Sequence, residues 1–290
     1  MSTQGGSVTT SRQHTLGNGG GTFDVQGVGN SYQLNAFATI NGPGQLTKTG
    51  NGTLNIQSGN SYSGGTAING GTFLANNVAG SATGTGAVTV ASGATLGGSG
   101  FIVPTTGSTA TNLVTINGTD SPGNSSGTLT IGSASFDSTV VASGAYNFEL
   151  STAGLSASLN TGGSSPALPH TNHDVINVFG TIDITGLTVN IASDGSTGFN
   201  NAADYSWLIA RASVSLTGTA ALGTVSGTDF GDLAGGFFSL GTSGTDLYLN
   251  FTASAIPEPT TLSLLGLMAA GGGFYSWSKR KRLIGKNQVF

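Results

Sequence analysis

The sequence predicts an all-β fold in which short strands and glycine turns repeat and stack as a β-solenoid. Of the 290 residues, 50 are glycine and 7% are charged, while 37% are hydrophobic. The chain can therefore form a core, but it is poor in residues that favour helices. Apolar residues also alternate with Thr or Asn, which is the period of a strand. A unit of one turn and one strand recurs along the chain, as in stacked repeat proteins.

The alternation is clearest in four segments between residues 53 and 150. Each segment can present one apolar face to a core and one polar face to solvent. The apolar positions are Leu54 and Ile56, Val88 and Val90, Leu129 and Ile131, and Tyr146, Phe148 and Leu150.

The repeating unit is a glycine followed by Thr, or by Ala-Thr, and then an apolar residue. A single unit cannot bury its apolar face alone, so stacking the units into a column is the physical solution. Glycine and Asn at the corners provide positive φ, and Thr, Val and Ile suit the strands between them. The unit begins at Gly52, Gly71, Gly93 and Gly127.

Residues 44–54 and 60–76 resemble the autotransporter-associated β-strand repeat. The motif continues at 84–90, 93–98 and the Ser-Pro-Gly-Asn-Ser turn of 121–125, so the resemblance covers residues 42–131. It implies a right-handed parallel β-helix of the kind found in secreted passenger domains, without enzymatic activity of its own.

These patterns predict five segments along the chain. Residues 136–251 keep the strand alternation but lose the repeat motif, which fits either a solenoid end or a small β-sandwich-like cap. The predicted segments are a polar, glycine-rich start or first solenoid turns (1–39), the repeat solenoid (40–135), a β-rich continuation or cap (136–255), a C-terminal signal (256–282) and a short tail (283–290).

The C-terminal signal combines three features in a fixed order. Ile256-Pro-Glu-Pro-Thr260 precedes an uncharged stretch, 261–278, and then the basic cluster Lys279, Arg280, Lys281 and Arg282. The stretch reaches the lower length limit of a membrane-spanning helix, and the positive-inside rule keeps the basic cluster cytoplasmic. A buried helix of a soluble fold is the alternative.

The same features resemble the PEP-CTERM sorting signal, which an exosortase recognises. The resemblance implies that Pro257, Glu258 and Pro259 form the recognition motif, that 261–278 holds the chain in the inner membrane transiently, and that residues 279–282 stop transfer. It implies membrane anchoring during export and then a cell-surface or extracellular location. No apolar run in residues 1–30 resembles a secretion signal, so we expect a truncated or misplaced start.

Charge excludes nucleic acid as a partner. All twelve acidic residues lie at or before Glu258, whereas five of the eight basic residues lie between Lys279 and Lys286. Residues 1–278 therefore hold three basic and twelve acidic residues, a net charge of -9, and phosphate contacts need clustered Lys and Arg. The chain also lacks cysteine, which excludes a disulfide scaffold.

No cofactor or metal is expected. His170, His173 and Asp174 form the one local cluster of metal-ligand types, and we interpret it as a solvated loop because a firm site needs three or four converging ligands. Asp174, Asp183 and Asp194 lack the tight spacing of a calcium loop.

An enzyme is the least favoured hypothesis. β-Helices host polysaccharide lyases and glycosidases, and the latter need a pair of carboxylates. Glu149, Asp174 and Asp183 could supply such a pair, but Arg211 stands alone and nothing in their spacing points to catalysis.

The sequence thus predicts an exported, non-catalytic β-solenoid of the cell surface or extracellular matrix. Its expected partners are an exosortase for processing and exopolysaccharide for retention. The alternatives are an autotransporter-like adhesin passenger and, third, a polysaccharide-degrading β-helix enzyme. Phe237, Phe238 and Tyr248 could form an apolar patch for sugars or self-association, although core packing is the more common role of such residues.

Overall fold

The computed structural model describes residues 2–4, 6–105, 113–151, 172–193, 195 and 198–254. The chain divides into two units, 1–253 and 254–290, and all the elements described below lie in the first. The expected C-terminal helix and the whole C-terminal signal after residue 254 fall outside the described residues.

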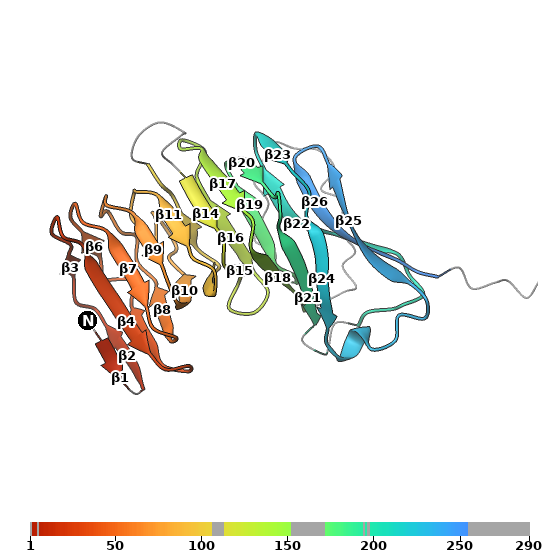
Figure 1. Cartoon of the computed structure of the whole chain (residues 1–290), viewed down its shortest axis with the longest axis horizontal. Coiled ribbons are helices and arrows are strands. Elements are labelled where there is room, and N and C mark those ends of the chain that lie inside the picture. Colours follow the sequence, from red (N-terminus) through yellow and green to blue (C-terminus); the bar gives the residue numbers. More distant parts are fainter. Residues whose placement is uncertain are drawn as a thin grey trace, which may run out of the picture. The chain divides into compact units, whose positions relative to one another are not determined.

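The first unit is a parallel β-helix, as the sequence predicts. Its chain visits two long sheets in turn, and strands of successive coils lie side by side (Figure 1). Sheet A consists of β1 (Ser2–Gln4), β4 (Gly21–Gln26), β7 (Leu46–Thr49), β9 (Thr66–Ile68), β11 (Val88–Val90), β14 (Leu113–Ile116), β17 (Ser138–Ala142), β20 (Gly180–Asp183) and β23 (Ser215–Thr217).

Sheet B follows sheet A in every coil. It consists of β2 (Ser7–Thr10), β5 (Ser31–Leu34), β8 (Thr53–Ile56), β10 (Gly71–Ala75), β12 (Ala94–Gly98), β15 (Thr119–Pro122), β18 (Ala145–Leu150), β21 (Thr188–Ser193) and β24 (Ala221–Ser226).

The third side of the column has shorter strands. Sheet C pairs β3 (His14–Thr15) with β6 (Ile40–Asn41), and later coils contribute to sheet D. In spatial order, sheet D consists of β13 (Phe101–Ile102), β16 (Thr128–Ile131), β19 (Val175–Val178), β22 (Tyr205–Ala212), β26 (Asp246–Thr252) and β25 (Phe237–Ser243).

Residues in register stack into rows through the core. In sheet A, Leu46 pairs with Thr66 and Thr66 with Val88, so these coils are 20 and 22 residues long. The coil from Val140 to Ile182 is 42 residues long, yet it returns to the same row. Insertions between strands therefore change the loops and leave the row of buried side chains intact.

The β-helix ends in an antiparallel hairpin. β25 and β26 pair with each other, and β26 adds to β22 in the antiparallel sense, whereas the preceding strands of the three sides pair in parallel. The bidentate ion pair of Arg211 with Asp246 joins β22 to β26. A short 3₁₀ helix, η1 (Thr228–Phe230), precedes the hairpin. Of the two possibilities for 136–251, the structure has a solenoid end and not a β-sandwich.

Aromatic residues fill this end of the core. The Tyr205 and Trp207 rings stack at 5.0 Å with 7° between their planes, and the centroids of Phe199 and Phe251 are 4.8 Å apart. Phe238 is buried as expected, but Phe237 is 57% exposed, so the expectation of core packing is wrong for Phe237. The two residues alternate along β25, and only one of them can face the core.

One lysine lies inside the column. Lys48 is in the row of Ile68 and Val90 and is fully buried. Its Nζ donates to the carbonyl oxygens of Thr49, Gly50 and Gly70 at 2.8, 2.9 and 3.0 Å. Burial lowers the pKa of Lys48 to about 8. At neutral pH the ammonium therefore stays charged and joins the corners of two successive coils.

Glycine corners are the predicted weak points of the fold. Gly65 and Gly93 have nearly the same φ, 84° and 83°. A Cβ at Gly65 would lie 2.7 Å from the Ala87 carbonyl oxygen, whereas one at Gly93 would meet nothing within 4 Å. The pair separates the cost of backbone conformation from that of close packing.

We predict that Gly93→Ala lowers the free energy of unfolding by about 1 to 2 kcal/mol, the usual cost of a left-handed conformation for an L-residue. Gly65→Ala should cost clearly more, because the neighbouring backbone must also move. Urea unfolding of both variants, followed by circular dichroism, measures the difference. Equal losses would show that the coils at Gly65 are less tightly packed than the structure indicates.

Candidate functional site

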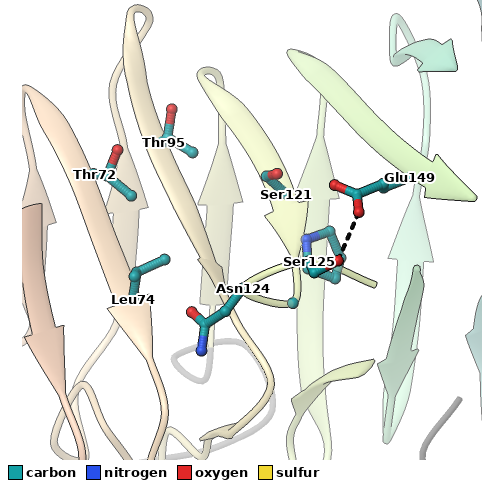
Figure 2. Close-up of a pocket in the computed structure, with 9 residues that line it drawn as sticks. Thr72, Leu74, Thr95, Ser121, Asn124, Ser125 and Glu149 are labelled. Carbon is teal, nitrogen blue, oxygen red and sulfur yellow. Dashed lines mark hydrogen bonds between the residues drawn. The ribbon is translucent and has the colours of Figure 1, made fainter. Parts of the chain in front are cut away.

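The candidate site is a groove on the outer face of sheet B. Two hollows of about 480 and 400 Å³ adjoin there and share Ser121 and Glu149 in their walls. We call the two together the sheet B groove. Its first hollow includes Thr72, Leu74, Thr95, Ser121, Asn124 and Glu149 (Figure 2). Its second hollow includes Asn147, Glu149, Asn190, Ala192, Thr224 and Ser226.

The groove follows from strand alternation combined with stacking. Inward positions of sheet B form the core row of Leu54, Phe73 and Leu96, so the residues between them face outward. In the outward row, Leu74 pairs with Gly97 and Gly97 with Ser121. Because Gly97 has no side chain, the row is shallow between its two neighbours.

Hydrogen bonds hold the polar groups of the groove in place. The Ser125 hydroxyl donates to Glu149 Oε1 at 2.8 Å (Figure 2). The Asn190 side-chain amide donates to Asn147 Oδ1 at 3.0 Å, and the Thr224 backbone N–H donates to Asn190 Oδ1 at 3.0 Å. These bonds run from coil to coil, so each one fixes a side chain relative to the next strand.

Asp174 supports the groove from inside. It is buried, and its Oδ1 and Oδ2 accept the backbone N–H groups of Gly127 and Glu149, both at 2.9 Å. Burial raises the pKa of Asp174 to about 8, against the opposite effect of the two N–H donors. Asp174 thus connects the strand that carries Glu149 to the end of the turn that carries Ser125.

A second carboxyl group lies within the core row itself. Asp120 stands in register between Leu96 and Tyr146 and is fully buried. Neither carboxyl oxygen has a hydrogen-bond partner of ordinary geometry, although the nearby Ser121 N–H favours ionisation slightly. Burial raises the pKa of Asp120 to about 7. The column therefore favours the neutral acid at this position.

The structure corrects the expectation of a solvated loop at His173 and Asp174. His173 is 5% exposed, its Nε2 lies 3.0 Å from the Leu208 carbonyl oxygen, and its ring packs against Phe148. Both residues are drawn into the column because they lead directly into the buried strand β19. His170 and Asp194 fall outside the described residues. Within the described ranges, no group of three acidic or histidine side chains is arranged to hold a metal ion.

The structure separates the remaining candidate residues. Glu149 lies in the groove, but Asp183 lies on sheet A, where its Oδ1 accepts the Thr185 backbone N–H at 2.9 Å. Arg211 is bound to Asp246, and Tyr248 donates to the same carboxylate. Pro257, Glu258, Pro259 and the basic cluster 279–282 lie outside the described residues, as does 261–278. In the described part of the chain, no helix has the length and apolarity that a membrane crossing requires.

One family comparison found a match. The family model of the passenger-associated transport repeat matches residues 46–75, which comprise β7, β8, β9 and β10. No curated protein matches the chain. The match supports the autotransporter-associated part of the resemblance, and it associates the chain with cell-surface or secreted proteins.

The two buried carboxyl groups predict an unusual dependence of stability on pH. Because their pKa values are raised in the folded chain, that state binds more protons than the unfolded state between about pH 4 and pH 8. Stability should therefore fall as the pH rises through this window, by at most about 1.4 kcal/mol per pH unit for each extra proton.

We predict that Asp120→Asn makes this slope shallower, since an amide of the same shape does not titrate. Urea unfolding at pH 5 and pH 8 measures the slope in the natural chain and in the variant. Asp183→Asn is the matched control, because this exposed carboxyl has a lowered pKa and should leave the slope unchanged. An unchanged slope in Asp120→Asn would contradict the raised pKa of Asp120.

Proposed function

We propose that the chain is a β-helical surface or secreted protein of the autotransporter-passenger type, with a structural or adhesive function. The observation that carries this proposal is the passenger-associated repeat at 46–75, embedded in a column whose sheets continue on both sides of it. A stacked column displays a long regular face without requiring a separate core for each part. Such a face suits multivalent attachment.

We propose further that the column is not an enzyme. Among the described residues that line the sheet B groove, Glu149 alone carries a charge. A glycosidase needs two carboxyl groups on opposite sides of the scissile bond. Asp174 is close in the structure, but it is buried and occupied by two backbone N–H groups. The arrangement supports binding over the less favoured polysaccharide-degrading activity.

Exosortase processing is a second proposal, which rests on the C-terminal sequence. The Pro257-Glu258-Pro259 motif, the uncharged stretch 261–278 and the basic cluster follow one another in the order of a sorting signal. Two prolines keep the motif extended, a form suited to a protease groove. On this proposal the mature chain ends near the motif and is retained by exopolysaccharide at the surface.

The test is the intact mass of the protein in the envelope, extracellular and intracellular fractions of its native organism. We predict that the protein occurs at the surface or outside the cell. A chain found there that ends between Pro257 and Thr260 would support sorting as well. A surface chain that retains residues 279–282 would support the surface proposal and contradict processing. A protein confined to the intracellular fraction would contradict both.

A further inference from the structure

We propose that the sheet B groove binds an extended, uncharged hexose polymer laid along the axis of the column. This inference deepens the proposed surface function, on which it rests for its biological setting, and names the class of ligand. Its physical basis is the lining of the groove, the spacing of its polar groups and its charge.

The lining matches the chemistry of sugar hydroxyl groups. Asn147, Asn190 and Asn124 carry amides, and Thr95, Ser121 and Thr224 carry hydroxyls. These groups both donate and accept hydrogen bonds, as the hydroxyl groups of a sugar do. The Glu149 carboxylate accepts one bond from Ser125 but can accept several more. Its remaining acceptor capacity can take hydroxyl groups of a ligand in charge-assisted bonds.

The spacing of the groups favours a linear ligand. The groove crosses six strands of sheet B, from β10 to β24. Neighbouring strands lie about 4.8 Å apart, so the groove offers a polar rung at that interval over roughly 24 Å. This interval is close to the repeat of a fully extended hexose chain, whose successive rings can each meet one rung.

The charge of the groove selects among such polymers. Glu149 is negative, and no Lys or Arg is among the described residues that line either hollow. The stretch 1–278 has a net charge of -9, as its three basic and twelve acidic residues require. A polymer of uronic acids would therefore meet repulsion, whereas a neutral polymer would not.

The groove is organised before a ligand arrives. Asn147 and Asn190 are joined by a hydrogen bond, and Ser125 fixes Glu149. Asp174 holds the backbone of Glu149 from the inner side. Binding would therefore order few protein groups, which lowers its entropic cost.

The experiment is calorimetric titration of the full chain with three hexasaccharides. Cellohexaose is uncharged and extended, maltohexaose has the same composition but curls, and hexagalacturonate is anionic. We predict that cellohexaose binds, and that the other two bind at least about tenfold more weakly, a difference comparable to the loss of one charge-assisted hydrogen bond.

Variants locate the binding to the groove. Glu149→Ala and Asn147→Ala, which change the walls at two points, should each weaken cellohexaose binding by about five- to tenfold. Asp183→Asn changes a carboxylate on sheet A and should bind as the natural chain does. Thermal unfolding of each variant checks that the column is intact, and the two wall variants give independent readings.

Three results would overturn the inference. They are the absence of cellohexaose binding, equal binding of maltohexaose or hexagalacturonate, and unchanged binding in both wall variants. Failure here would leave the surface proposal standing, because that proposal is tested by the location of the protein in the cell. Conversely, binding by a protein found only inside the cell would support the groove and contradict the surface function.

Discussion

Register between coils is the constraint on which the rest of this structure depends. Each coil must return its strands to the same sheets, so that backbone hydrogen bonds join it to the coils before and after. Coils of 20, 22 and 42 residues satisfy this requirement equally, because the loops absorb the difference. The inward rows then form a continuous core, and the outward rows form a surface with the same spacing. Core and groove are two faces of one register.

Polar groups inside the column show what the register tolerates. Lys48 is accepted because three corner carbonyl oxygens meet its ammonium, and Asn60 because its amide bonds backbone groups of other coils at Ile40 and Ala82. Asp120 has no such partners and is accommodated as a neutral acid. A buried group that lacks partners costs stability, so Asp120 is the position where the column departs most from an apolar core.

The sequence predicts the β-helix because its causes are local. The alternation at Leu54 and Ile56 fixes which side chains face inward, and glycine marks the corners. The groove could not be predicted, since Ser121 and Glu149 meet only when strands 24 or more residues apart are stacked. The burial of Asp120 was equally hidden, because Thr-Asp-Ser-Pro has the composition of an exposed turn. The antiparallel closure by β25 and β26 depends on pairing order, which composition does not encode.

The most direct test of this account is cross-linking in register, which the absence of natural cysteines allows. Thr72 and Thr95 are paired on neighbouring strands of sheet B, about 4.8 Å apart, within the range that a disulfide spans. Thr72 and Thr119 are in the same row but two strands apart. The account predicts that Thr72→Cys with Thr95→Cys forms a disulfide in the folded chain, whereas Thr72→Cys with Thr119→Cys does not. Equal cross-linking of both pairs, or of neither, would contradict the register of the column.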